Sequence, residues 1–395
     1  MDYFEPTRDA ALARLADFVP KAGRAYAHGR NTDLGRGQHT DVSTLSPYTR
    51  RRLLTEREIV EAVLPIHGRD GAEKFIAEVF WRTYFKGWLE RRPGVWAQYT
   101  RSRDTLLDEW QGRKWLEKAE NGRTEIAVFD EWVQELVETG YLHNHSRMWF
   151  ASIWIFTLGL PWQLGADFFL RHLLDGDPAS NTLSWRWVAG LHTRGKHYLA
   201  QRTNIERFTR NRPGVEPGQL DETAEPLEES FDYGEALPVR DALPLDPARP
   251  SVLLLTMEDS HPESLSLPEM RGVATLDIDG RSPRETSPLV RAFDAASLED
   301  TARRMGGAAL PANTVEALAE WAIAAGATQI VTPFTPRGPV HDWLTAAAPA
   351  LSARGVTLAE TRREWDSLVW PYATAGFFKV KKAIPKVLNS LGMDG

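Results

Sequence analysis

The chain has 395 residues, a formal net charge of −7, and 42% hydrophobic and 26% charged residues, which is typical of a soluble globular protein long enough for two domains. Because it contains no cysteine, disulfides, thiolate zinc sites, Cys-ligated iron–sulfur clusters and thiol nucleophiles are excluded. No run of eighteen apolar residues occurs, and the acidic N-terminus lacks the apolar core of a signal peptide. We therefore expect a cytoplasmic protein with no membrane partner.

Four segments in the first half of the chain have apolar residues at helical spacing, and they predict an all-helical domain over residues 1–210. Gly140 and Gly159 stand where two of these helices would need a C-terminal glycine. The four segments are FIAEVFWRTYFKGWLE, EIAVFDEWVQELVETG, SRMWFASIWIFTLG and GADFFLRHLL.

The composition changes twice after these helices. Residues 211–249 are rich in Pro, Glu, Asp and Gly without apolar periodicity, which predicts a linker. Beyond them, SVLLLTM, GVATLDID, TQIVTPF and VTLAET are predicted strands, and TVEALAEWAIAAGA and WLTAAAPALSARG are predicted helices. This order predicts a small parallel α/β domain, Rossmann-like, over residues 250–395. The last stretch, GFFKVKKAIPKVLNSLG, is predicted to be a basic helix packed on that domain.

Charge and tryptophan are unevenly distributed along the chain. Residues 1–215 hold 31 Lys and Arg against 27 Asp and Glu, a net of +4, whereas the remainder holds 16 against 27, a net of −11. The mildly basic first half leaves room for a local nucleic-acid-binding face. Eleven of the 15 tryptophans lie between Trp81 and Trp187. Since cysteine is absent, redox chemistry would depend on a bound organic cofactor or on aromatic residues.

The stretch from Gly140 to Trp187 combines charged, amide and aromatic side chains within GYLHNHSRM, LLDGDPASN and WRW. Ordinary cores avoid buried charge unless it is paired. A flavin site needs all three kinds of side chain, because it holds a planar polar ring with a redox-active edge. The stretch therefore predicts part of a flavin site.

Several motifs follow one another in the order of a known family, and with near-family spacing. They are STLSPYTRRRLLTERE, FIAEVFWRTYF, GRTEIAVFD, TGYLHNHSRM, LLDGDPASN and WRWVAG. From about Tyr26 to Arg210 the chain resembles the photolyase/cryptochrome superfamily. The resemblance implies an α plus α/β protein whose all-helical part is a photolyase-type FAD-binding domain. SVLLLTMEDSHPESL loosely resembles the start of the family's antenna domain, here in rearranged order after the flavin domain.

The resemblance implies that one hydroxyl-bearing loop, formed by Ser43, Thr44, Leu45 and Ser46, binds the FAD diphosphate. Elementary chemistry agrees, since a Ser/Thr turn before a helix offers N–H and hydroxyl groups to an anion. The alternative is that Ser46 only caps that helix, with Pro47 as its first residue.

The other residues implied to bind FAD lie further along the chain. Arg147 is expected to pair with Asp175, and Asn181 corresponds to the residue nearest flavin N5. The remaining implied FAD-binding residues are Tyr26, Arg82 and Asp177.

A second group of residues is implied to act on a substrate or on electrons. Trp185 and Trp162 correspond to the family's electron-transfer chain, whose outer member here is Trp110, Trp115 or another residue. The residues implied to hold a flipped pyrimidine dimer are Glu78, Trp81, Asn144, Met148 and Trp187. The alternatives are a surface Glu78–Arg82 pair beside a core Trp81, and ordinary core packing for each tryptophan.

Two functions remain open at this point. The first is a light-driven lyase that acts on damaged DNA by transferring an electron from reduced FAD to a cyclobutane pyrimidine dimer. The second is a cryptochrome-like photoreceptor with an unknown signalling partner, which His145 favours because the dimer-repair enzymes usually carry Arg there. A protonated His145 would still be able to donate to a phosphate. Either function allows a second antenna chromophore of unknown identity.

Two further alternatives receive less support from the residues. A metal site at His143 and His145 lacks an evident third ligand, so no metal is expected. A helical protein without flavin would leave Arg82, Arg147 and Asp175 as costly buried charges.

Overall fold

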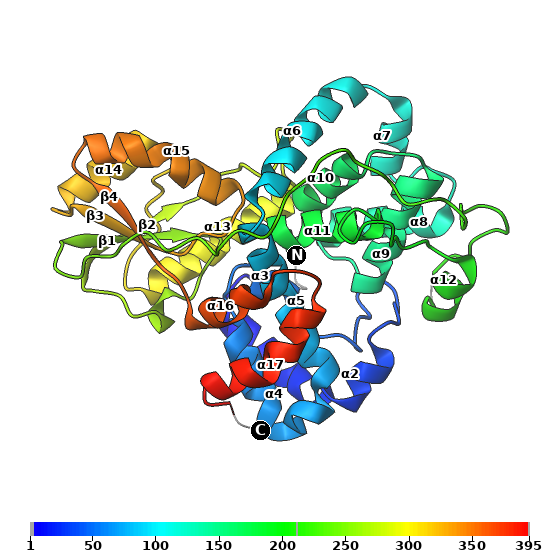
Figure 1. Cartoon of the computed structure of the whole chain (residues 1–395), viewed down its shortest axis with the longest axis horizontal. Coiled ribbons are helices and arrows are strands. Elements are labelled where there is room, and N and C mark those ends of the chain that lie inside the picture. Colours follow the sequence, from blue (N-terminus) through cyan, green and yellow to red (C-terminus); the bar gives the residue numbers. More distant parts are fainter. Residues whose placement is uncertain (1–3, 211, 394–395) are drawn as a thin grey trace.

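The computed structural model describes residues 4–210 and 212–393. Helices make up the part of the chain that precedes the sheet (Figure 1). They are α1 (Arg8–Phe18), η1 (Val19–Lys21), α2 (Arg24–Gly29), α3 (Ser46–Arg50), α4 (Glu56–Gly71), α5 (Glu73–Glu90), α6 (Pro93–Trp110), α7 (Lys114–Glu120), α8 (Ala127–Thr139), α9 (Asn144–Ser152), the π-helical η2 (Ile153–Thr157), α10 (Trp162–His172), α11 (Pro178–Val188) and α12 (Arg202–Phe208). The prediction of an all-helical first part is confirmed. Within the described part, no helix has the length and apolar character that crossing a bilayer requires.

The sheet has four parallel strands in the order β2-β1-β3-β4, which confirms the predicted small parallel α/β arrangement. The strands are β1 (Ser251–Thr256), β2 (Met270–Leu276), β3 (Gln329–Pro333) and β4 (Thr357–Thr361). The helices beside them are α13 (Pro288–Arg304), α14 (Val315–Ala324) and α15 (Pro339–Ala353), with the short η3 (Pro262–Ser264) after β1.

Strand β1 is buried on both faces, as its unbroken apolar sequence predicts. Val252 and Leu254 point into the cluster that contains the inner faces of α14 and α15. Leu253 and Leu255 pack instead with Leu298 of α13. The alternation of side chains along the strand therefore places helices on both faces of the sheet.

The last helices do not pack on the sheet, so the prediction for the basic tail is wrong. They are α16 (Glu364–Val369), η4 (Trp370–Tyr372) and α17 (Phe378–Ser390). Trp365 of α16 packs against Phe80 of α5, with ring centroids 4.6 Å apart and planes tilted by 40°. Trp370 of η4 lies so close to α5 that a Cβ on Gly87 would stand 2.5 Å from its ring. The inward residues of α17 join the same helical core. Apolar residues of α5 and of α17 thus share one core.

Residues 212–250 contain no helix or strand and are fastened to both parts of the molecule. Leu227 N donates to Ala189 O, and Leu237 N donates to Arg91 O. Arg240 pairs with Glu360 of β4 at 2.6 Å. The segment therefore crosses the surface from α11 to the sheet, held by hydrogen bonds and an ion pair; we call it the strap.

Three consecutive arginines that follow the Ser43–Ser46 loop connect the helices to the second half of the chain. Each guanidinium is buried and binds a carboxylate from a different element. The pairs are Arg50 with Glu258 after β1 (2.7 Å), Arg51 with Asp294 of α13 (2.5 Å) and Arg52 with Asp366 of α16 (2.7 Å). Since breaking a buried pair leaves an uncompensated charge, these contacts fix how the two halves fit together.

Replacing Arg52 with Met should destabilise the protein by about 3–5 kcal/mol, because Glu56, Asp259 and Asp366 would lose the cation they share. Urea unfolding followed by circular dichroism measures this loss. The control is Arg57→Met, since Arg57 is about half exposed and pairs with Glu61 on the surface of α4. That change should cost less than about 1 kcal/mol, and equal losses for both variants would contradict a structural role for the buried triplet.

Candidate flavin site

The Ser43–Ser46 loop forms a tight turn before α3. Helix α3 begins at Ser46, and its N-cap is Leu45, which makes no side-chain capping bond. The alternative that Ser46 caps the helix is therefore wrong. Thr44 adopts φ +50°, a left-handed conformation that is strained for a β-branched residue and that concentrates at functional turns. Its hydroxyl accepts from Arg14 (2.7 Å), so a cation stands beside this turn.

The predicted pair between Arg147 and Asp175 is present. Arg147 of α9 places Nη2 3.0 Å from Asp175 Oδ2, while its Nε donates to Leu142 O. Burial alone would raise the pKa of Asp175, but the charges of Arg147 and Arg82, with the Ser46 hydroxyl, hold it below its ordinary value. Asp175 is therefore ionised at neutral pH, between the loop before α3 and helices α5 and α9.

Asp177, one of the predicted FAD-binding residues, is also the N-cap of α11. It caps α11, since its Oδ1 accepts from Ser180 N (2.8 Å). Its other oxygen lies 3.5 Å from Lys86 Nζ and 4.0 Å from Arg50 Nε. Burial raises the pKa of Asp177, but Lys86, Arg50 and Arg82 lower it further, which keeps the carboxylate ionised.

Several buried polar atoms around these carboxylates have no hydrogen-bond partner among the described residues. They are Arg82 Nη1, Lys86 Nζ and Asp175 Oδ1. Each such atom costs about 1–3 kcal/mol or more when it is left unpaired. Asn181 of α11 is also buried and donates through Nδ2 to Ala166 O (2.7 Å). This mixture of cations, a carboxylate and an amide fits a planar ring with N–H and carbonyl edges joined to an anionic group, as in FAD.

Tyr26 and Glu78 are brought together by Arg30, away from the pair at Asp175. Arg30 Nη1 donates to Glu78 Oε1 (2.7 Å), and Tyr26 packs between Phe18 and Phe75. The alternative of a Glu78–Arg82 pair is therefore wrong. Burial raises the pKa of Glu78 despite the charge of Arg30, so its carboxyl takes up a proton more readily than an exposed one.

Trp81 forms part of an aromatic wall that includes one residue not foreseen from the sequence. The ring of Phe377, just before α17, stacks on Trp81 with centroids 4.0 Å apart and planes 16° apart. Tyr84 meets Trp81 edge-on and donates its hydroxyl to Ala375 O (2.9 Å). Phe377 belongs to the GFF sequence at the start of α17, but only the packing of α17 on α5 places its ring against Trp81.

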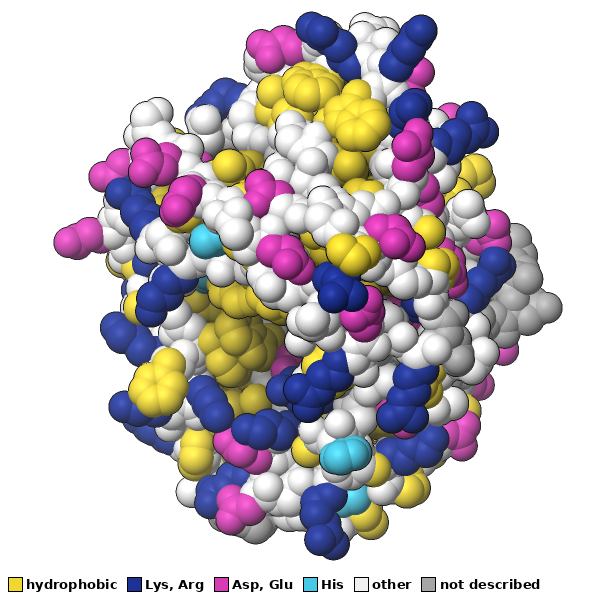
Figure 2. Space-filling model, turned by 90° about the vertical axis from the view of Figure 1, so that its right-hand side faces the viewer, with side chains coloured by type: hydrophobic (Ala, Val, Ile, Leu, Met, Phe, Trp, Pro, Cys, Tyr) yellow, Lys and Arg dark blue, Asp and Glu magenta, His cyan; other side chains and the backbone are white. Residues whose placement is uncertain are grey.

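The other residues implied to hold substrate differ in exposure. Asn144 is exposed at the start of α9, and Met148 is half-buried one turn later. Trp187 stacks on Tyr198, from the segment after α11, with centroids 5.8 Å apart. Figure 2 shows a hollow with hydrophobic side chains at its floor and several Lys or Arg side chains around it, on the face that lies to the right in Figure 1.

His145 does not suit a contact with phosphate through a protonated ring. It stacks on Trp149 at 4.1 Å, and its Nδ1 lies 3.1 Å from Asn31 O. Burial lowers its pKa, which favours the neutral ring. Burial also lowers the pKa of His143 to about 3. Across residues 4–210 and 212–393, no three His, Asp or Glu side chains are grouped to hold a metal ion.

The two tryptophans implied to carry electrons lie in the same helical core, where each one contacts different aromatic rings. The indole of Trp185 packs against Gly165 of α10, where a Cβ would stand only 2.3 Å from its ring. Trp162, at the start of the same helix, stacks on Tyr99 of α6 with centroids 5.7 Å apart. Tyr99 is followed by Trp96 at 5.5 Å. Neither Tyr99 nor Trp96 was identified from the sequence, although their spacing of three residues on a helix was a signal.

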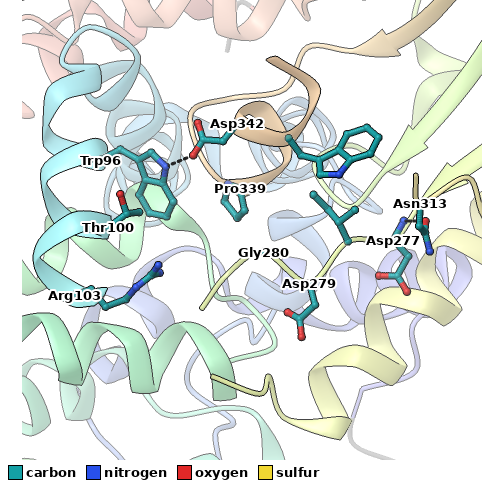
Figure 3. A pocket seen from close by; sticks show the side chains of 11 residues that line it. Trp96, Thr100, Arg103, Asp277, Asp279, Gly280, Asn313, Pro339 and Asp342 are labelled. Atoms are coloured by element: carbon teal, nitrogen blue, oxygen red, sulfur yellow. Dashed lines mark hydrogen bonds between the residues drawn. The ribbon is translucent and has the colours of Figure 1, made fainter. Parts of the chain in front are cut away.

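Trp96 opens onto a cavity of about 670 Å³ between α6 and the carboxyl edge of the sheet. Its Nε1 donates to Asp342 of α15 (2.7 Å). Arg103 lies further along α6 and lines the same cavity (Figure 3). Asp277 and Asp279 come from the loop after β2 on the opposite side. Carboxyl ends of parallel strands commonly form ligand sites.

Comparisons with known proteins agree with this geometry. A family model described as the FAD binding domain of DNA photolyase matches residues 75–211. The deoxyribodipyrimidine photo-lyase of Thermus thermophilus is 35% identical over 191 residues, which cover 47% of this chain and 43% of that protein. The corresponding protein of Neurospora crassa is 31% identical, over 46% and 30% of the two chains. The chain thus spans less than half the length of these curated relatives.

Among solved structures, a Synechocystis cryptochrome is 26% identical with a TM-score of 0.45, over 52% of this chain and 44% of that one. The match to the family model ends just after α12 and includes Arg82, Arg147, Asp175, Asp177 and Asn181. Residues 75–211 therefore match the FAD binding domain of DNA photolyase, and this part of the chain is similar to deoxyribodipyrimidine photo-lyases.

Proposed function

We propose that the protein is a flavin-dependent lyase that uses blue light to split cyclobutane pyrimidine dimers in DNA. The observation that carries this proposal is the ion pair of half-buried Arg147 with buried Asp175. Beside it, the buried atoms Arg82 Nη1 and Asp175 Oδ1 have no hydrogen-bond partner among the described residues and would suit a flavin. Relatives named deoxyribodipyrimidine photo-lyase support the lyase over other flavoprotein activities. When bound, FAD would supply light-driven transfer of one electron.

The chain's own residues would bind and orient this cofactor. The turn at Ser43–Ser46 would receive the diphosphate, with Arg14 beside it. Asp175 and Asn181 would fix the ring edge, and Arg147 would stabilise negative charge there as a preorganised cation. Tyr26, Thr44, Leu45, Arg82 and Asp177 would complete the cofactor-binding set.

The substrate would be a dimer flipped out of the DNA helix. Flipping costs a few kcal/mol, and least for a damaged, poorly stacked base. Trp81 and Trp187 would offer ring faces for stacking, worth about 1–3 kcal/mol per base. Glu78, Asn144 and Met148 would line the remaining walls. Burial raises the pKa of Glu78, while Arg30 lies 2.7 Å from its carboxylate.

Electrons would reach the cofactor through aromatic residues. Trp185 and Trp162 would form the inner part, and the stacking of Trp162 on Tyr99 supports an outward continuation to Trp96. This route ends at the cavity beside the sheet. Trp115 is the alternative outer member, since it is 40% exposed on α7, where an external reductant can reach it.

A second candidate function is a photoreceptor of the cryptochrome type without repair activity. Two observations favour it: Phe377 covers one face of Trp81, and the buried, neutral His145 stands where the repair enzymes usually carry Arg. Light would then alter binding of a signalling partner.

The organisation of the rest of the chain belongs to the same proposal. It consists of the helical FAD-binding domain over residues 1–210, a linker over 211–249, and a Rossmann-like domain over 250–395, related to the family's antenna domain in rearranged order. The cavity beside Trp96 would accept a second, light-harvesting chromophore. Its indole and carboxylate lining suits a planar ring with N–H donors.

Repair is tested with a thymine-dimer oligonucleotide, chemically reduced flavoprotein and blue light. Chromatography should show loss of the dimer in the light and none in the dark. Trp81→Leu should lower dimer affinity roughly five- to hundredfold, because one stacking face is lost. The control is Trp115→Leu, on the remote α7. No light-driven repair by the fully reduced protein contradicts the lyase and leaves the photoreceptor.

The electron route is tested by the rate of flavin photoreduction in the presence of a thiol reductant. Trp185→Phe should slow photoreduction strongly, since phenylalanine is much harder to oxidise than tryptophan. Tyr99→Phe keeps the stacked ring but removes the oxidisable phenol, so it should slow the same step several-fold. If Trp110→Phe slows photoreduction while Tyr99→Phe leaves it unchanged, the route through Tyr99 and Trp96 is wrong.

A further inference from the structure

Helix α17 presents a basic and aromatic face to solvent. Its inward side chains, among them Val380, Ile384 and Val387, are buried in the helical core. The outward face holds Phe378, which is 65% exposed, with Lys379, Lys382 and Lys386. The helix has four lysines and no acidic residue, although residues 216–395 as a whole are strongly acidic.

Stability of the helix does not account for these lysines. Lys379 and Lys382 lie near the N-terminus of α17, where the helix dipole disfavours positive charge. Lys381 has a carboxylate partner, Glu73, at 2.9 Å. Lys379 donates to the Thr374 hydroxyl, and Lys382 lies over the ring of Phe378 at 4.6 Å. Lys386 forms no ion pair with any residue that the structure describes. The outward charges therefore remain available to an anion.

This face adjoins the wall of the proposed substrate cavity. Phe377, the residue directly before α17, stacks on Trp81, and the preceding turn is held by bonds from Tyr84 to Ala375 O and from Arg92 to Thr374 O. The first turn of α17 is thus fixed beside Trp81.

We propose that α17 is a DNA-binding element at the mouth of the cavity. Lys382 and Lys386 contact phosphates of the strand that carries the flipped nucleotides, with Lys379 at the cavity edge, and Phe378 packs against an exposed neighbouring base. The proposal rests on the function proposed above, and it extends beyond the family segment, which ends at residue 211. Charge complementarity and continuity with the cavity select DNA, since cations interleaved with an exposed aromatic ring suit a nucleic-acid strand.

The test is fluorescence anisotropy with a labelled duplex, undamaged or carrying one thymine dimer, at several salt concentrations. Lys382→Gln with Lys386→Gln should weaken binding to both duplexes and lower the slope of log K against log salt by about 2. Phe378→Ala should weaken binding about fivefold or more with the slope unchanged. All three side chains are exposed, so circular dichroism should show unaltered folding.

The control is Lys114→Gln with Lys118→Gln on α7. These lysines are also exposed and one helical turn apart, and Lys118 lies over Trp115 as Lys382 lies over Phe378. Equal weakening by both double variants would show a general effect of net charge and overturn the proposal. Unchanged binding by the α17 variant of a protein that still repairs dimers would overturn it and leave the repair function standing. Binding that depends on Lys382 and Lys386 without any repair would support α17 and count against the lyase.

Discussion

The buried arginine triplet at residues 50–52 is the constraint on which the arrangement of this molecule depends. A guanidinium removed from water needs a carboxylate, and Glu258, Asp294 and Asp366 come from three elements that lie far from α3 in sequence. The sheet, α13 and α16 are therefore held against one short helix. That helix follows directly on the turn proposed to bind the FAD diphosphate.

The same triplet joins the proposed flavin site to the second half of the chain. Arg50 lies 4.0 Å from Asp177 and binds Glu258 after β1, while Lys86 lies within 4.0 Å of both carboxylates. The pair of Arg147 with Asp175 stands beside this network through Arg82. Cofactor geometry and the packing of the two halves are consequently coupled by charge. The strap at residues 212–250 and α17 add further contacts between the halves.

Local patterns in the sequence were sufficient to predict most of the secondary structure. Helices α5, α8 and α10 follow apolar periodicity, and β1 and β3 follow continuous apolar runs. The pair of Arg147 with Asp175 was also predicted, because the family resemblance carries both positions. The remaining contacts depend on which surfaces meet in three dimensions. The partners of Arg52, the stacking of Phe377 on Trp81 and the position of Tyr99 beside Trp162 join residues far apart in the chain, and no local pattern encodes them.

The most direct test of the account is the visible absorption spectrum of the purified protein, followed by titration of the flavin-free protein with FAD. The account predicts flavin bands, and FAD binding that is strongly weakened by Asp175→Asn, since the change removes the charge that Arg147 and Arg82 share. The matched change Asp70→Asn, at an almost fully exposed carboxylate, should leave binding unaltered. A protein that shows no flavin bands and binds no added FAD, or one whose affinity is indifferent to Asp175→Asn, would contradict the assignment of this buried charge group as the flavin site.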